Sequence, residues 1–147
     1  MALSVRHAGL VVRDLERSLA FYRDIIGLKV RARMTESGEY IERVVGIPGA
    51  VLEWAKLECP EGSLVELIEY KKGMDSTGDP GNAAADRRGF SHVAFTVRNI
   101  DDLYRTLEGR GFHCNNPPEP SPDGLVKVMY CHDPDGIIVE LVEELNK

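Results

Sequence analysis

The order of apolar and polar residues in the first half of the chain predicts strands around one helix. Residues 3–12 alternate loosely between apolar and polar side chains, as a strand with one buried face does, and His7 lies near the middle. Apolar residues then recur with helical spacing from Leu15, after Asp14 in an N-cap position, and Gly27 is placed to end this helix. The pattern goes on to predict a strand (28–34), a polar turn (35–38), a segment that suits either a strand or a short helix (40–45), a break (46–49) and a strand (50–58).

Two pairs of matching segments show that the chain contains an internal repeat. Residues 60–69 (PEGSLVELIE) align without a gap with residues 134–143 (PDGIIVELVE), at an offset of 134 − 60 = 74. Each segment opens with a Pro–acid–Gly turn and continues with branched apolar residues, which predicts the second strand of a hairpin. Residues 7–18 (HAGLVVRDLERS) align in the same way with residues 92–103 (HVAFTVRNIDDL), at an offset of 92 − 7 = 85. We therefore interpret the chain as a duplicated unit.

The second half repeats the order strand, helix, strands. A strand begins at His92, and Asn99 precedes a helix at residues 100–110. A proline-rich loop (115–124) and a hairpin built from residues 125–131 and 137–144 follow.

The two offsets differ by 85 − 74 = 11 residues, which predicts an insertion in the first half, at about residues 39–49.

One helix cannot cover both faces of its sheet, so two such units can pair into a curved sheet around a cleft. We predict an α+β fold of two βαβββ modules within a single domain, residues 1–147. Module one is 3–70, a linker rich in Gly, Asp, Pro and Ala is 71–89, and module two is 90–145.

Composition narrows the class of partner. The 147 residues are 43% hydrophobic and 29% charged, as in an ordinary soluble globule, and the net charge of −6 argues against nucleic acid or an anionic membrane as a partner. No apolar run is long enough to span a bilayer, and the first residues do not resemble a signal peptide. Cys59, Cys114 and Cys131 form neither a disulfide framework nor a zinc ribbon, so we expect reduced thiols and a cytoplasmic location.

The repeat places two kinds of ionisable residue at equivalent positions. Glu66 and Glu140 lie in the middle of apolar strands, where a carboxylate is costly unless a partner compensates its charge. His7 and His92 lie on the first strand of each half. Two imidazoles and two carboxylates suit a divalent manganese, iron, cobalt, nickel or zinc ion. We therefore predict that all four side chains meet at one metal.

Each of these residues alone has a simpler explanation. A single strand histidine is more often packed and hydrogen-bonded, and a single strand glutamate more often faces water; the paired recurrence favours the metal. His113 and His132 have no repeat partner and are expected on the surface or in loops. Glu69 and Glu143 recur near strand ends, where a solvated edge is expected. Cys131 is expected to be a small core residue.

Four segments resemble the vicinal oxygen chelate superfamily, which includes glyoxalase I, methylmalonyl-CoA epimerase, extradiol dioxygenases and fosfomycin- and bleomycin-resistance proteins. The resemblance covers about residues 4–145 and implies paired βαβββ modules. It also implies that His7, Glu66, His92 and Glu140 are the metal ligands, in a homodimer whose metal site lies within one chain or across the subunit interface. The segments that carry it are residues 7–30, 64–70, 89–97 and 133–143.

The chemistry common to the family is binding of two neighbouring substrate oxygens to a divalent metal. The resemblance thus predicts a metal-dependent lyase or isomerase of the glyoxalase I type, like lactoylglutathione lyase or methylmalonyl-CoA epimerase. Such an enzyme moves a proton next to a carbonyl through a metal-bound enediolate. We expect Glu66 and Glu140 to act both as ligands and as the acid–base pair.

Several substrates and two other functions remain open. Glutathione-using bacterial members have Arg four residues after the first His and Asn four residues after the first Glu, where this chain has Val11 and Tyr70. The epimerase typically has Gln in place of Glu66. An iron-dependent extradiol dioxygenase would use His7, His92 and Glu140, but Glu66 would occupy a position that oxygen needs. A metal-free drug-binding resistance protein is the third possibility, although it has no need for these four ligands.

Overall fold

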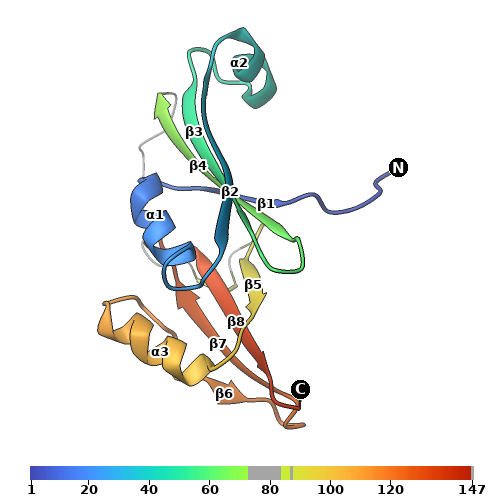
Figure 1. The fold of residues 1–147 in the computed structure, drawn as a ribbon, viewed down its shortest axis with the longest axis vertical. Coiled ribbons are helices and arrows are strands. Elements are labelled where there is room, and N and C mark those ends of the chain that lie inside the picture. The colour runs from blue at the N-terminus through green and yellow to red at the C-terminus, as the bar shows by residue number, and fades with distance from the viewer. Residues whose placement is uncertain (73–83, 87, 147) are drawn as a thin grey trace. The chain divides into compact units, whose positions relative to one another are not determined.

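The computed structural model describes residues 1–72, 84–86 and 88–146, which form parts of two compact units, Met1–Gly78 and Asp79–Lys147 (Figure 1). Each unit is described by itself. Most of the predicted linker, 71–89, lies outside the described residues, namely 73–83 and 87. Its first two residues belong to the last strand of the first unit.

The first unit is a four-stranded sheet with two helices. One helix lies on a face of the sheet, and the other belongs to the connection between two consecutive strands. The strand order is β1-β4-β3-β2, with β1 parallel to β4 and the other neighbours antiparallel. The elements are β1 (Ala8–Val11), α1 (Leu15–Tyr22), β2 (Lys29–Ser37), α2 (Glu39–Val45), β3 (Val51–Glu58) and β4 (Leu64–Lys72).

The second unit repeats this topology without the extra helix. Its strand order is β5-β8-β7-β6, again with the first strand parallel to the last. The predicted α+β fold of two βαβββ modules is therefore confirmed. The elements are β5 (His92–Thr96), α3 (Ile100–Gly109), β6 (Glu119–Pro120), β7 (Val126–His132) and β8 (Ile138–Glu144).

Helix α2 is the predicted insertion. Ala8 pairs with Val65 in the first unit and His92 with Ile138 in the second, separations of 65 − 8 = 57 and 138 − 92 = 46 residues. Their difference, 11, equals the difference between the two repeat offsets. The ambiguous segment 40–45 is thus helical, and it ends where Gly46 adopts a left-handed φ of 72° that favours glycine.

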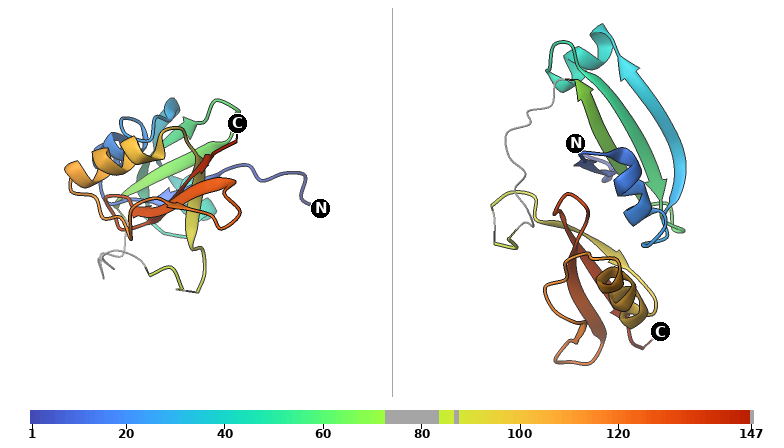
Figure 2. Two further views of the ribbon diagram at one scale, coloured as in Figure 1. Left: turned by 90° about the horizontal axis from the view of Figure 1, so that it is seen from below. Right: turned by 90° about the vertical axis from the view of Figure 1, so that its left-hand side faces the viewer.

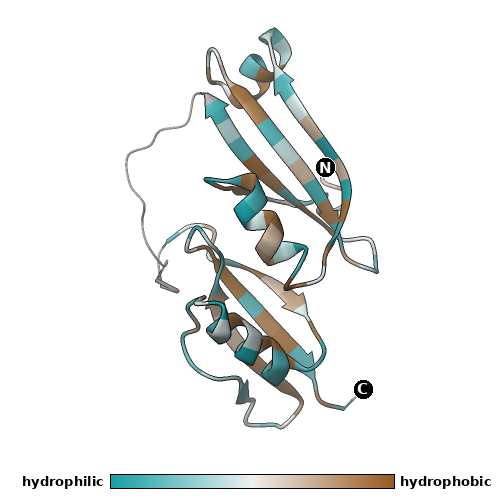
Figure 3. Ribbon diagram, turned by 60° about the vertical axis from the view of Figure 1, so that its left-hand side comes forward, coloured by the Kyte–Doolittle hydropathy of each residue, from teal (hydrophilic) through white to brown (hydrophobic). Residues whose placement is uncertain are grey.

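Helices α1 and α3 each lie against one face of their sheet (Figure 2), and the side chains on that face are buried. Alternate strand residues point to opposite faces, so apolar and polar residues alternate along the strands (Figure 3). Each large apolar side chain that is fully buried contributes about 1.5–3 kcal/mol. The buried residues include Leu10, Leu15, Leu19, Tyr22, Ala55, Leu57, Val65 and Leu67 in the first unit, and Phe95, Ile100, Leu107, Met129, Val139 and Leu141 in the second.

Two predicted boundaries in the first unit are wrong. The first strand begins at Ala8 rather than at residue 3, so His7 precedes the strand instead of lying within it. Its neighbour β4 begins at Leu64, and the residues before His7 therefore have no parallel strand to pair with. Helix α1 ends at Tyr22 because the amides of Ile25 and Ile26 both donate to the Phe21 carbonyl and the chain leaves the helical path.

Two further corrections concern polar segments that join a sheet. The predicted turn at 35–38 continues β2 as far as Ser37, because Glu36 and Ser37 pair with Leu52 and Val51 of β3. The proline-rich segment 115–124 contains the short edge strand β6, which pairs with β7. In both cases pairing with a distant strand decides the structure.

Candidate functional site

The first unit brings His7 and Glu66 into contact. Glu66 lies on β4 between Gly9 of β1 and Lys56 of β3. The Nε2 atom of His7 is 3.3 Å from Oε2 of Glu66, and the two side chains are 31% and 14% exposed. A histidine and a carboxylate predicted from the repeat thus form one half-buried pair.

The second unit brings His92 and Glu140 together in the same way. Glu140 lies on β8 between Ala94 of β5 and Tyr130 of β7. The Nε2 atom of His92 is 2.9 Å from Oε2 of Glu140, and the side chains are 30% and 22% exposed. His92 pairs with Ile138, which is two residues before Glu140. In the first unit, His7 directly precedes Ala8, and Ala8 pairs with Val65, the residue before Glu66. The two pairs therefore occupy equivalent diagonal positions in the repeat, although His92 lies on its strand and His7 directly precedes its own.

Both pairs lie on the sheet face that their helix leaves open. The carboxylate of Glu69 accepts a hydrogen bond from the first amide of α1, and that of Glu143 accepts two from the start of α3. Because side chains alternate along a strand, Glu66 and Glu140, each three residues earlier, point to the opposite face. The open faces can therefore meet a ligand that the helices do not cover.

The distances within each pair fit two ligands of one ion. Two donors about 2.1 Å from a metal are about 3.0 Å apart at right angles and about 3.4 Å apart at a tetrahedral angle. The measured 3.3 Å and 2.9 Å fall at about these values. The buried Nδ1 atom of His7 has no hydrogen-bond partner among the described residues, so its contact with Glu66 is the only polar contact described for this ring. The donor set therefore fits a divalent cation; without an ion, each contact is an imidazole–carboxylate hydrogen bond.

Neither pair is a complete site by itself. Within each unit, the part of the chain that the structure describes holds no group of three or more His, Cys, Asp or Glu side chains able to bind a metal. Divalent ions of these kinds take four to six ligands. Each pair therefore supplies part of a coordination sphere.

The ring of His92 has supporting contacts that the sequence did not reveal. The Ser91 hydroxyl is 3.0 Å from Nδ1 of His92, and the Tyr130 hydroxyl is 3.4 Å from the same atom. Burial and the neighbouring Glu140 carboxylate raise the pKa of Tyr130 above its ordinary value. Groups that hold the second nitrogen of a metal-binding histidine fix its orientation and tautomer.

Lys56 and Tyr130 are equivalent residues with different chemistry. Tyr130 occupies the position of Lys56 in the repeat, since 130 − 56 = 74. Lys56 lies opposite Glu66, with its Nζ atom 4.9 Å from the ring centre of Trp54, whose Nε1 donates to Glu36 over 3.1 Å. The repeat offset could have identified this pair of positions, but nothing in the sequence linked Ser91 to the site.

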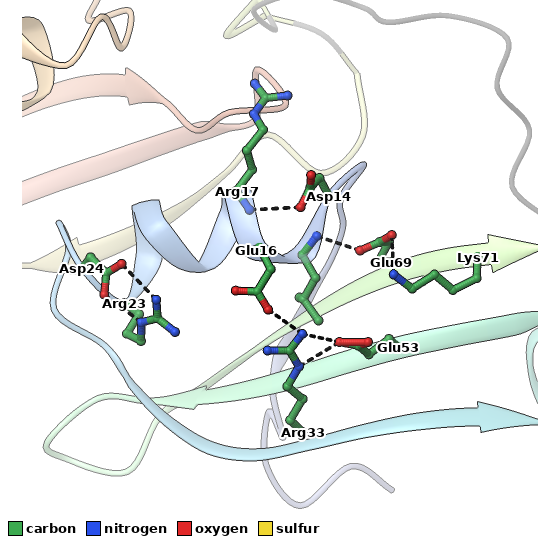
Figure 4. Close-up of polar contacts among 10 residues, drawn as sticks. Asp14, Glu16, Arg17, Arg23, Asp24, Arg33, Glu53, Glu69 and Lys71 are labelled. Atoms are coloured by element: carbon green, nitrogen blue, oxygen red, sulfur yellow. Dashed lines mark hydrogen bonds and ion pairs between the residues drawn. The ribbon is translucent and has the colours of Figure 1, made fainter.

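The other residues considered from the sequence have structural roles. Glu69 and Glu143 are not solvated edge residues: both hold a helix start, as Figure 4 shows for Glu69 beside the first residues of α1. His113 is exposed as expected, but His132 is 2% exposed because β7 extends one residue further than predicted. Cys131 is fully buried, which confirms it as a core residue.

Comparison with known proteins gives a consistent family. The sequence matches the model of the Glyoxalase/Bleomycin resistance protein/Dioxygenase superfamily over residues 4–141. It is 30% identical to the lactoylglutathione lyase of Salmonella typhimurium over 138 residues, which cover 93% of this chain and 90% of that enzyme. It is also 30% identical to a probable lactoylglutathione lyase of Synechocystis over 142 residues, covering 96% and 95%.

Solved structures share the fold. A glyoxalase family protein from Bacillus cereus superposes with a TM-score of 0.90 at 26% identity, covering 99% of this chain and 97% of that one. The fosfomycin resistance protein of Listeria monocytogenes superposes with a TM-score of 0.63 at 18% identity, covering 99% and 97%, a likeness of fold alone. No helix among the described residues is long and apolar enough to cross a membrane. The chain belongs to the Glyoxalase/Bleomycin resistance protein/Dioxygenase superfamily, as its resemblance to the vicinal oxygen chelate proteins predicted.

Proposed function

We propose that this protein is a divalent-metal-dependent enzyme of the glyoxalase I type, which transfers a proton at a carbon next to a carbonyl. One observation carries the proposal: each unit holds a histidine Nε2 against a glutamate Oε2, at equivalent positions on its open sheet face. The relatives named lactoylglutathione lyase, at about 30% identity over nearly the whole chain, support the reaction class.

His7, Glu66, His92 and Glu140 would together hold one nickel, cobalt, zinc, manganese or iron ion. Such an ion supplies Lewis acidity, which stabilises negative charge on two neighbouring substrate oxygens. One solved form of the fosfomycin resistance protein from Listeria monocytogenes is a complex with Mn(II), so a protein of this fold can hold a divalent ion. Mixed nitrogen and oxygen donors suit all five metals.

The chain's own residues account for proton movement and for positioning. Glu140 and Glu66 come from different units and are partly exposed, so one carboxylate takes the proton from carbon and the other returns it. Ser91 and Tyr130 hold the His92 ring in place. Exchange of either glutamate for glutamine keeps an oxygen ligand but removes the base.

The substrate of a glyoxalase I is a hemithioacetal, and the identity of the thiol that forms it is a separate question. Val11 and Tyr70, at the positions where glutathione-using relatives have Arg and Asn, pair with Ile68 and Leu52 and thus lie on the same sheet face as Glu66. Val11 is 54% exposed. This part of the face therefore carries an apolar side chain in place of the arginine, whose cation could bind a carboxylate of the thiol. We therefore propose that the hemithioacetal substrate contains a thiol other than glutathione.

Metal-reconstituted protein tests the proposed reaction. Hemithioacetals of methylglyoxal with several thiols are assayed beside methylmalonyl-CoA and catechols, and isomerisation of a hemithioacetal is expected. Glu66→Gln and Glu140→Gln should each lower kcat by about 100-fold or more while metal stays bound. Glu69→Gln, which removes a carboxylate from the opposite face of β4, is the matched control and should keep full activity.

Three outcomes contradict the proposal. Full turnover of a glutamine variant with metal bound would exclude the acid–base role. Iron-dependent oxygen uptake with a catechol would indicate a dioxygenase. Protein that is purified without chelator, holds under about a tenth of an equivalent of metal and takes up none on reconstitution would be a metal-free binding protein.

A further inference from the structure

Two of the three cysteines face each other across strands in the second unit. Cys114 follows α3 and forms an isolated antiparallel bridge with Cys131 of β7. Both are free thiols, and they are only 8% and 0% exposed. Nothing in the proposed reaction uses either of them.

The backbone hydrogen bonds around this bridge define its type. The Asn115 amide donates to the Tyr130 carbonyl and the His132 amide to the His113 carbonyl, each over 2.9 Å. Cys114 and Cys131 lie between these two bonds and are therefore a non-hydrogen-bonded pair. In such pairs the Cα atoms are about 4.5 Å apart and the side chains approach closely on one face. A disulfide needs Cα atoms about 4.4–6.8 Å apart, so the backbone already satisfies this requirement.

Each thiol is at present engaged elsewhere. The Sγ atom of Cys131 donates to the Val139 carbonyl over 3.4 Å, and the Glu108 carboxylate of α3 lies near the Cys114 thiol. Rotation about each Cα–Cβ bond turns the two sulfur atoms toward each other without moving a strand. The exchange breaks one S–S bond in the oxidant and forms one in the protein, and only weak thiol contacts are lost.

We propose that Cys114 and Cys131 are a redox modification site, which closes to a cross-strand disulfide in the presence of a low-molecular-weight disulfide. The Cys114 thiolate attacks one sulfur of this oxidant, which releases one small thiol and leaves a mixed disulfide on Cys114. The Cys131 thiolate then attacks the Cys114 sulfur, which releases the second small thiol. The protein loses two electrons and two protons, and the oxidant gains both as two thiols.

The surroundings of the two thiols make the exchange slow, and the product closes a covalent loop. Burial and the nearby Glu108 carboxylate raise the pKa of Cys114 to about 11, and burial with the neighbouring Cys114 raises the pKa of Cys131 to about 12. The thiolate fraction is therefore small at neutral pH, which slows attack. The product closes residues 114–131, including the edge strand β6 and Tyr130, into one covalent loop.

Peptide mapping of the full-length protein tests the proposal. Trypsin cleaves after Lys56, Lys71, Arg110 and Lys127, so the three cysteines fall on separate peptides, 57–71, 111–127 and 128–147. The protein is equilibrated with reduced and oxidised glutathione at increasing oxidising ratios, quenched in acid, alkylated and digested without reduction. The expected product links 111–127 to 128–147, at a mass about 2 Da below the sum of the reduced peptides.

Matched variants separate this bond from other oxidation. Cys59→Ser should keep the linked peptides, and Cys114→Ser should lose them. The oxidised Cys59→Ser protein should melt at least about 5 °C above its reduced form, because the new loop restricts the unfolded chain. The proposal is overturned if both cysteines stay alkylatable at the most oxidising ratio, or if glutathione remains on Cys114 as a mixed disulfide.

Discussion

The two histidines of the candidate site differ in what holds their rings. His92 has the Ser91 and Tyr130 hydroxyls within 3.0 Å and 3.4 Å of its Nδ1 atom. The corresponding atom of His7 has no partner among the described residues. A ring without such a contact is held on one side only, so the two halves are equivalent in their ligands but not in the support of their rings.

This difference predicts unequal effects of two single substitutions on metal affinity. Ser91→Ala should lower the affinity for a divalent ion by about 10–100-fold, because it removes the nearer contact to His92. Tyr130→Phe should lower it less, since its hydroxyl is further away. Competition with a chelating dye measures both affinities.

A tyrosine outside the site provides the control for these substitutions. Tyr104→Phe removes a hydroxyl from α3, away from the open sheet face, and should leave the affinity unchanged. An equal loss in all three variants would show a general destabilisation instead of a positioning role.

The raised pKa of Cys131 predicts a dependence of stability on pH. The folded chain keeps this thiol neutral up to about pH 12, whereas the unfolded thiol ionises near its ordinary value of 9.0. Its stabilisation is therefore complete below pH 9 and is lost as the pH rises toward 12, by up to about 1.4 kcal/mol per pH unit.

Urea unfolding at pH 8, 9, 10 and 11 measures this effect. The free energy of unfolding should fall more steeply for the natural sequence than for Cys131→Ala, in which the thiol is absent. Other groups titrate in both proteins, so the difference between the two slopes isolates the thiol. Identical slopes would contradict the assignment.

At the scale of elements, each helix begins on a carboxylate from the last strand of its sheet. The first amide of α1 donates to Glu69 over 2.8 Å, and Asp14 adds its own cap by accepting from Arg17. Helix α3 relies more on the strand: Asn99 has a left-handed φ of 56° and makes no side-chain cap bond, while Glu143 accepts from the amides of Asn99 and Ile100. These contacts satisfy amides that a helix start leaves unpaired.

Removal of the two strand carboxylates should therefore have unequal costs. Glu143→Gln should lower the free energy of unfolding by about 1–2 kcal/mol, because α3 has no other side-chain cap. Glu69→Gln should cost less, since Asp14 still caps α1. The exposed Glu119→Gln, as control, should change it by under about 0.5 kcal/mol. Urea titration measures all three, and equal losses for Glu69 and Glu143 would contradict this assignment.

The sequence predicted the order of elements better than their ends, for a physical reason. The 11-residue difference between repeat offsets located α2, because a duplicated unit reveals its own insertion. The polar segment 35–38 was predicted as a turn, yet most of it pairs with β3. A local pattern contains no information on such a partner, and an edge strand with polar residues resembles a loop.

At the scale of the whole molecule, the repeat predicted which ionisable residues lie in contact, and their role as metal ligands stays a proposal. Duplication singled out His7, Glu66, His92 and Glu140, and each pair is in contact within its own unit. Glu69 and Glu143, which also recur, were wrongly expected at a solvated edge. Their carboxylates instead accept hydrogen bonds from the amides at a helix start. Ser91 could not be found, since its role depends on a ring orientation that the sequence does not contain.

Metal stoichiometry tests whether the four residues act at one centre. The reconstituted protein should hold one divalent ion per chain, and His7→Ala and His92→Ala should each abolish tight binding. Two independent half sites would instead lose half of the metal in each variant. Free metal at 100 times its Kd should stabilise the fold by about 2.7 kcal/mol, and chelator should remove this increment. Elemental analysis and thermal melts with and without chelator measure both.

The position of α2 has a consequence for how such a protein can diversify. Residues 39–49 enter between β2 and β3, yet the registry of β1 on β4 is the same as in the half that lacks them. Tyr40 and Val44 are exposed on this helix. A lineage, or an engineer exchanging this stretch, can thus change the exposed side chains at this end of the sheet while the histidine–glutamate contact stays where it was.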